Sequence, residues 1–160
     1  MKKIVIIGGG FGGLSAAAVL CSIKLNLDIS VIDPKQGSDF LPLLPDIIGR
    51  PISPQFLTYR IEDISKKKGF KFINEEVIAL SLEKKEVSTS SRTLGYDYLL
   101  ITSGSQTNFY NNDNIRDNAY KLDDTGDVKK ITEALRQNEF DNFIIAGAGY
   151  TGIEVATNLR

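Results

Sequence analysis

The sequence contains no histidine. Histidine is the side chain that most readily exchanges protons near neutral pH, and its imidazole is the commonest protein ligand of metals. Acid–base catalysis by histidine and histidine metal sites are therefore excluded for these 160 residues.

Cysteine is nearly absent as well, because Cys21 is the only one. An enzyme that works through a redox-active disulfide needs two thiols. This sequence cannot by itself be a disulfide reductase. We expect Cys21 to be a small buried thiol on a helix.

Long apolar runs and an excess of positive charge are also missing. The net charge is −1 and no basic stripe stands out, which argues against a nucleic-acid partner. No apolar run approaches the ~20 residues of a membrane-spanning helix. An apolar strand begins so close to the N-terminus that no room is left for a signal peptide. We therefore expect a cytoplasmic location, or the cytoplasmic face of a membrane if a further segment supplies an anchor.

Glycine, by contrast, is concentrated in two short motifs. Residues 8–13 are Gly-Gly-Gly-Phe-Gly-Gly, and residues 147–152 are Gly-Ala-Gly-Tyr-Thr-Gly. Both fit G-x-G-x-x-G, and each follows an apolar run, at 4–7 and 143–146, that predicts a strand. This strand–turn–helix setting is the one in which the motif indicates a dinucleotide site. Two copies predict an enzyme that holds two dinucleotides and passes electrons between them.

The glycines of such a motif have steric purposes. The first forms the tight turn, the second lets the backbone approach a pyrophosphate, and the third lets the helix pack closely on the strand. The free N–H groups at the start of the helix then bind the phosphates. A second apolar strand ends in Asp33, 20 positions after Gly13, where a carboxylate would accept hydrogen bonds from an adenosine ribose. An acid there favours FAD or NAD over NADP.

The remaining segments alternate between strand and helix patterns. The proline-rich segment 34–54 carries apolar residues that we expect to pack on the core or on a ligand, because such a loop is costly to expose. Helices are predicted at 61–68, ended by Gly69, and at 125–138. Strands are predicted at 70–73, 76–82, 86–90, 92–96 and 97–102, the middle three of which form an antiparallel meander.

Together these elements predict an α/β fold, with a Rossmann-like parallel sheet, covering helices and a small antiparallel β-meander crossover, incomplete in these residues. We expect residues 1–108 to be an FAD-binding domain. Residues 109–119, rich in asparagine and aspartate, predict a surface connector. Residues 120–160 would begin a NAD(H)-binding domain.

The ordered set of motifs resembles the two-dinucleotide-domain flavoproteins, and most closely the type II NADH dehydrogenases (NADH:quinone oxidoreductases). The most selective combination joins the acid after the second strand, the Phe-Leu-Pro-Leu-Leu loop at 40–44 and the Thr-Ser-Gly-Ser-Gln-Thr-Asn turn at 102–108. The matching stretches are 8–14, 31–33, 40–44, 76–77, 96–108 and 147–156.

The resemblance implies FAD as cofactor and NADH as substrate. The first glycine turn would hold the FAD pyrophosphate, Asp33 its ribose, and main-chain groups at Val77 its adenine. The loop at 42–43 would pass the flavin ring, the second glycine turn would bind NADH, and Glu154 would be the catalytic residue near flavin and nicotinamide. The cofactor-binding residues implied are Gly8, Gly10, Phe11, Gly12, Gly13, Asp33, Pro34, Lys35, Pro42, Leu43, Val77, Thr102, Ser103, Gly104, Gly147, Gly149 and Gly152.

The implied activity is hydride transfer from NADH to the flavin, followed by electron delivery to a quinone-type acceptor. Two alternatives stay open: a non-catalytic dinucleotide-binding module, and a related reductase with another acceptor, of the sulfide:quinone, ferredoxin or rubredoxin type. Relatives carry a longer chain with membrane-binding helices, so we expect this sequence to be the N-terminal part of such an enzyme and inactive alone. A half-formed second domain leaves dimerisation open as a way to cover its apolar face.

Overall fold

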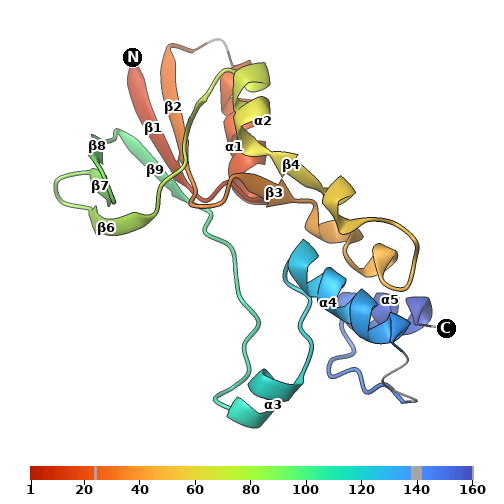
Figure 1. The fold of residues 1–160 in the computed structure, drawn as a ribbon. Helices are drawn as coiled ribbons and strands as arrows, with labels where there is room; N and C mark the ends of the chain where they lie inside the picture. The colour runs from red at the N-terminus through yellow and green to blue at the C-terminus, as the bar shows by residue number, and fades with distance from the viewer. Residues whose placement is uncertain (24, 138–141, 160) are drawn as a thin grey trace. The chain divides into compact units, whose positions relative to one another are not determined.

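The structure is a computed structural model that describes residues 1–23, 25–137 and 142–159 (Figure 1). The predicted end of the second helix at Asn138 and the final residue, Arg160, lie outside the described residues. The chain forms two compact units, which we call unit 1 and unit 2. Unit 1 comprises residues 1–38 and 59–105, and unit 2 comprises residues 39–58 and 106–160.

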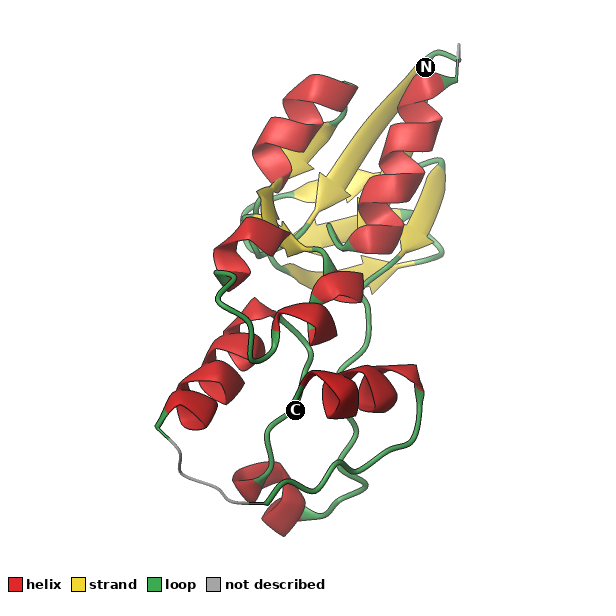
Figure 2. Ribbon diagram, turned by 90° about the vertical axis from the view of Figure 1, so that its right-hand side faces the viewer, coloured by secondary structure: helices red, strands yellow, loops and turns green. Residues whose placement is uncertain are grey.

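Unit 1 is built on a parallel sheet. Its strands are ordered β5-β2-β1-β9, with bounds β1 Lys2–Ile7, β2 Leu27–Ile32, β5 Lys71–Ile73 and β9 Tyr98–Ile101. Each neighbouring pair runs parallel. The helices α1 (Phe11–Ser22) and α2 (Ile61–Lys68) lie beside this sheet (Figure 2).

A three-stranded antiparallel meander packs against the same sheet. It consists of β6 (Val77–Ser81), β7 (Glu86–Thr89) and β8 (Thr93–Gly95). The predicted α/β fold with its meander is therefore confirmed, together with the helix at 61–68. Two short strands, β3 (Gly37–Asp39) and β4 (Thr58–Arg60), form a separate two-stranded sheet where the chain passes between the units.

Side-chain alternation along β1 divides the core of unit 1 into two layers. Ile4 and Ile6 belong to the cluster that packs with α1. Val5 belongs to the cluster that packs with Val87 of the meander. Successive side chains of a strand point to opposite faces, so β1 is buried on both sides, as its continuous apolar run requires.

Unit 2 is formed by helices and short 3-10 turns. The helices are α3 (Asp113–Asn118), α4 (Thr125–Arg136) and α5 (Tyr150–Asn158), and the 3-10 turns are η1 (Leu41–Leu43), η2 (Pro45–Ile47) and η3 (Pro54–Leu57). Its core gathers Leu44, Ile47, Ile48, Leu57 and Val128. Three apolar residues of the segment 34–54, namely Leu44, Ile47 and Ile48, thus join the core of unit 2, as expected.

The structure differs from two expectations. Residues 142–148 contain no strand, although 143–146 predicted one. The backbone of a strand needs a neighbouring strand as hydrogen-bond partner, and no described strand of unit 2 pairs with this segment. Within the predicted connector at 109–119, the structure contains the short helix α3, whose residues are all exposed. Cys21 is half-buried against the α1 cluster, and burial raises the pKa of its thiol.

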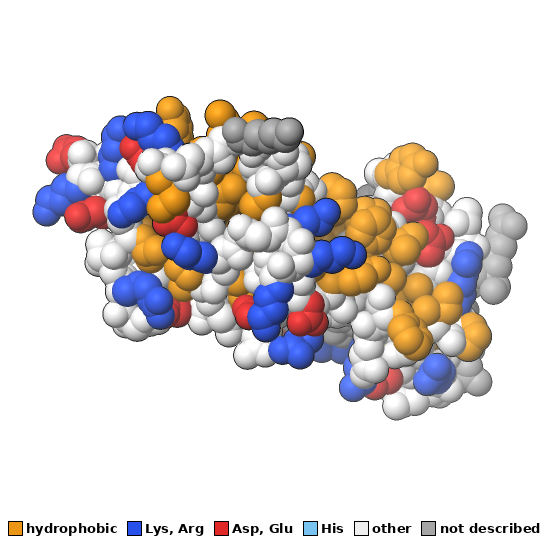
Figure 3. Space-filling view, turned by 90° about the horizontal axis from the view of Figure 1, so that it is seen from above, with side chains coloured by type: hydrophobic (Ala, Val, Ile, Leu, Met, Phe, Trp, Pro, Cys, Tyr) orange, Lys and Arg blue, Asp and Glu red, His pale blue; other side chains and the backbone are white. Residues whose placement is uncertain are grey.

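Hydrophobic side chains also reach the surface of both units (Figure 3). In unit 1 they include Ile78 and Tyr98, and in unit 2 Phe56 and Ile144, the last of which is 96% exposed. Along the described residues, no helix combines the length and the apolar character needed to cross a membrane.

Candidate functional site

The first glycine turn is closed on one side and open on the other. Gly8 has φ +104°, a left-handed conformation that favours glycine. A Cβ at Gly8 would overlap the carbonyl oxygen of Thr102, and a Cβ at Gly13 would overlap that of Gly8. At Gly10, by contrast, a Cβ would meet no atom within 4 Å. The turn is therefore packed against protein at Gly8 and Gly13 and leaves space at Gly10.

That space adjoins the start of α1. Gly10 is the N-cap residue and provides no side-chain cap. The first hydrogen bond of the helix runs from Leu14 N to Gly10 O at 3.0 Å. The first amides of a helix have no acceptor within the helix, and together with the helix dipole they attract an anion. The buried, compact Gly13 allows α1 to start this close to the sheet.

The carboxylate of Asp33 is held beside this turn. Its Oδ2 accepts a hydrogen bond from Gly9 N at 2.7 Å, and its Oδ1 accepts one from Lys35 N at 2.7 Å. Charge-assisted bonds of this length fix the orientation of the group. A carboxylate has about four acceptor positions, so Asp33 keeps capacity for further donors such as ribose hydroxyls.

Thr102, at the end of β9, braces the same turn. Its N–H donates to Ile7 O at 2.8 Å. Its Oγ1 lies 2.9 Å from Ile7 O and 3.0 Å from Gly8 O. The next residues, Ser103 and Gly104, are exposed, and Gly104 has φ +78°. The Thr102 hydroxyl is thus used within the protein to hold the turn.

Val77 opens β6, where it pairs with Thr89 of β7. Its side chain packs against the cluster that contains Val5, Ile32 and Val87. What Val77 can present to a ligand is therefore its main chain, in keeping with the role that the family resemblance implies.

The second glycine turn, in unit 2, has the same local geometry as the first. Gly147 has φ +121°. The N-cap Gly149 has φ −72° and ψ 177°, against −78° and −167° for Gly10. A Cβ at Gly152 would overlap the carbonyl oxygen of Gly147, as at the first turn. The glycine spacing thus produces the same turn where no strand precedes it.

Glu154 and the loop at 42–43 both lie in unit 2. Glu154 is half-buried on α5, and Pro42 and Leu43 are exposed on η1. Val155 on α5 and Leu159, directly after it, pack with the cluster that contains Leu44 and Ile47.

Two side-chain hydrogen bonds of Asn158 add to that packing. Asn158 Nδ2 donates to Pro45 O at 3.0 Å, and Arg50 Nη2 donates to Asn158 Oδ1 at 3.0 Å. The helix that carries Glu154 is therefore attached to the segment that carries Pro42 and Leu43.

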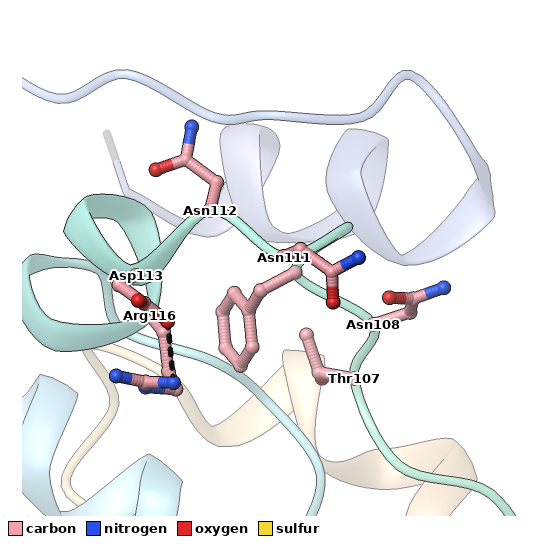
Figure 4. Close-up of a pocket in the computed structure, with 7 residues that line it drawn as sticks. Thr107, Asn108, Asn111, Asn112, Asp113 and Arg116 are labelled. Carbon is pink, nitrogen blue, oxygen red and sulfur yellow. Dashed lines mark ion pairs between the residues drawn. The ribbon is translucent and has the colours of Figure 1, made fainter.

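A separate hollow of about 370 Å³ lies beside α3 (Figure 4). An ion pair between Asp113 and Arg116, 2.6 Å long, occupies its wall. The lining residues are Thr107, Asn108, Phe109, Asn111, Asn112, Asp113 and Arg116. This polar hollow contains none of the residues predicted to bind a cofactor.

Three residues outside the predicted set contact the Asp33 turn or the meander. Gly9 supplies the amide that binds Asp33. Asn74 Nδ2 donates to Asp33 O at 3.0 Å and to Pro34 O at 2.9 Å. The carboxylate of Glu75 accepts hydrogen bonds from the meander. The signal for the last two was their place directly after a parallel strand, at the carboxyl edge where ligands bind.

Comparison with known proteins bears on this geometry. A family model described as pyridine nucleotide-disulphide oxidoreductase matches residues 2–160. The external alternative NAD(P)H-ubiquinone oxidoreductase B4, mitochondrial, of Arabidopsis thaliana is 23% identical over 99% of this chain and 31% of its own length. The type II NADH:quinone oxidoreductase of Staphylococcus haemolyticus is 25% identical over 96% of this chain and 42% of its own length.

A solved structure is similar to this chain in both fold and sequence. NDH2 from Plasmodium falciparum in complex with NADH has a TM-score of 0.79 and 27% identity, over 98% of this chain and 36% of that one. The resemblance to type II NADH:quinone oxidoreductases is therefore confirmed. The chain spans between about a third and two fifths of the length of these relatives.

Proposed function

This chain belongs to the pyridine nucleotide-disulphide oxidoreductase family, and we propose that it is the FAD-binding portion of an enzyme that takes hydride from NADH and passes electrons to a quinone-type acceptor. The observation that carries the proposal is the first glycine turn with the Asp33 carboxylate bound beside it. The relatives named above support the NADH and quinone parts of the proposal.

The residues present fit an FAD pyrophosphate. The open position at Gly10, at the N-terminus of α1, can accommodate two phosphates. Asp33 is oriented to receive ribose hydroxyls, and an acid there disfavours a 2′-phosphate by charge repulsion. Phe11, Pro34 and Lys35 would contribute to the same cofactor site, as would residues 102–104. The Val77 main chain would receive the adenine.

The remaining roles are proposed within unit 2. Pro42 and Leu43 would lie along the flavin ring, and Gly147, Gly149 and Gly152 would bind the NADH pyrophosphate. When bound, the flavin supplies hydride acceptance and electron transfer, which the protein tunes by position and charge. Glu154 would contribute a carboxylate near the nicotinamide.

We also propose the functional division into an FAD-binding segment (1–108), a connector (109–119) and the beginning of a NAD(H)-binding domain (120–160). This division differs from the compact units, because residues 39–58 belong to unit 2. The location that fits a quinone acceptor is the cytoplasmic face of a membrane.

The glycine turn provides a sharp test of cofactor binding. Gly10→Ala adds a methyl group in open space, so we expect an unchanged melting temperature. The methyl group occupies the approach to the phosphates, so we expect FAD and ADP affinity to fall at least ~10-fold by isothermal titration calorimetry. Gly13→Ala should instead destabilise the fold by about 2–3 kcal/mol, because its Cβ overlaps backbone.

Gly95→Ala is the matched control, because a Cβ there has only an ordinary contact, 3.9 Å from Lys85 O. It should leave both stability and affinity unchanged. Equal FAD affinity in the Gly10→Ala and Gly95→Ala variants would contradict a pyrophosphate site at this turn. For the full natural protein, anaerobic NADH should bleach the flavin absorbance.

A further inference from the structure

Asn74 and Glu75 occupy the connection between β5 and β6, directly before the strand that begins at Val77. Neither residue belongs to the glycine motif, and neither is among the residues that the family resemblance implies. Both side chains make several hydrogen bonds to other segments of unit 1.

Asn74 is attached to the turn that carries the ribose acid. Its Nδ2 donates to two successive carbonyls, Asp33 O at 3.0 Å and Pro34 O at 2.9 Å. Within the same turn, Lys35 N donates a hydrogen bond to Asp33 Oδ1. Asn74 thus binds the backbone carbonyl of Asp33, while Gly9 N binds its carboxylate.

Glu75 is attached to the turn between β7 and β8. Its Oε2 accepts from Thr89 Oγ1, and its Oε1 accepts from Ser91 Oγ at 2.9 Å and from the guanidinium of Arg92. The main chain next to it continues the contact, because Ser90 N donates to Glu76 O at 3.2 Å. The Glu75 side chain is 15% exposed, so these bonds are partly shielded from water.

From these contacts we propose that Asn74 and Glu75 are positioning residues for the adenosine half of the dinucleotide: Asn74 sets the place of Asp33, and Glu75 sets the place of the Val77 main chain. The two residues are adjacent, so they join the ribose contact and the adenine contact into one rigid piece. Preorganisation of this kind raises affinity because the contacts need no ordering upon binding. The inference rests on the proposed function.

The test uses the whole chain and two near-isosteric substitutions. Asn74→Asp places a carboxylate oxygen against two carbonyls, and Glu75→Gln removes the charge that Arg92 pairs with. We expect each to weaken ADP binding about 10-fold by isothermal titration calorimetry. Hydrogen exchange should accelerate at Lys35 N in the first variant and at Ser90 N in the second, while the amides of β1 and β2 keep their protection.

Two controls separate positioning from general destabilisation. Glu76→Gln makes the same chemical change one residue along, at an exposed side chain, and should bind ADP like the wild type. Asp97→Asn removes the charge of a comparable carboxylate. Its Oδ2 accepts a hydrogen bond from Lys3 N at 2.7 Å, at the end of β1 opposite the glycine turn. It should lower the melting temperature and leave ADP affinity within about twofold.

The outcomes are distinguishable. A wild-type chain that binds neither FAD nor ADP overturns the proposed function, and the inference with it. A wild-type chain that binds ADP, with Asn74→Asp and Glu75→Gln variants that bind it equally well, overturns the inference alone. Loss of ADP affinity in Asp97→Asn as large as in Glu75→Gln also overturns it, because affinity would then follow stability.

Discussion

At the residue scale, the molecule separates glycines that the fold requires from glycines that a ligand would require. Gly8 and Gly13 cannot bear a side chain without meeting backbone, whereas Gly10 can. The protein itself therefore does not exclude a side chain at Gly10. The Asp33 carboxylate accepts hydrogen bonds from two main-chain N–H groups. A carboxylate has about four acceptor positions, so positions remain for further donors.

Two carboxylates, Glu75 and Asp97, predict how the stability of unit 1 depends on pH in the acid range. Hydrogen bonding from Thr89 chiefly holds the pKa of Glu75 below its usual 4.5, and the Lys3 amide chiefly holds that of Asp97 below its usual 3.8. A lowered pKa in the folded state means that the stabilisation is complete above the ordinary value and is lost as pH falls through the folded value. We expect the unfolding free energy of unit 1 to decline below about pH 4.5.

Urea unfolding monitored across the acid range checks this expectation. Glu75→Gln and Asp97→Asn should each flatten the decline, since the variant side chain no longer binds a proton on unfolding. A slope identical to that of the wild type in both variants would show that other carboxylates cause the acid sensitivity.

At the element scale, the helices whose ends carry local signals were predicted well. The helix α2 ends at Gly69, which has φ +90°, as a C-terminal glycine predicts. The helix α4 begins after Asp124, whose side chain accepts from Asp127 N. Asp39 adds a second cap, because its Oδ2 accepts from Thr125 N at 3.0 Å. That second contact comes from a distant segment and has no local signal.

The N-cap of α4 provides a prediction at this scale. Asp124→Ala removes the bond from Asp127 N, 3.1 Å long, and should destabilise unit 2 by about 1 kcal/mol. Urea unfolding followed by circular dichroism measures the change. Lys129→Ala, at an exposed position of the same helix, should change stability by less than about 0.5 kcal/mol. An equal effect of the two substitutions would argue against capping.

At the scale of the whole molecule, each compact unit has its own hydrophobic core. Unit 1 has clusters around Ile6 and around Val5, and unit 2 has one around Ile48. Both Ile6 and Ile48 are completely buried. The cluster in unit 2 joins residues from both of its chain segments, so the loop at 39–58 is structurally part of that unit.

The separate cores predict separable effects of cavity formation. Ile48→Ala should cost about 2–5 kcal/mol and accelerate hydrogen exchange in α4 and α5, with little change in β1 and β2. Ile6→Ala should do the reverse. Hydrogen exchange measured by mass spectrometry on both variants checks this. Equal acceleration throughout the chain in either variant would contradict two independent cores.

The sequence was sufficient for the features that depend on nearby residues. In both glycine turns the last glycine lies against the carbonyl oxygen of the first, a contact within six residues. This local contact explains why 147–152 adopts the geometry of 8–13 without a preceding strand. The end of α2 followed from Gly69, which is also a local signal. The apolar run at 143–146 predicted a strand that the structure does not contain. A strand depends on a neighbouring strand as hydrogen-bond partner, which a local sequence pattern does not supply.

Tertiary structure decided every feature in which separate segments meet. Only the parallel sheet brings Asn74 to the Asp33 turn and the Thr102 hydroxyl to Gly8, and only the meander gives Glu75 its partners. Hydrogen bonds are short-ranged and directional, so such contacts exist only once strands far apart in the chain have been set in register. The glycine spacing therefore determines the form of the turn that we propose as a phosphate site, and the folded sheet determines which distant residues contact that turn.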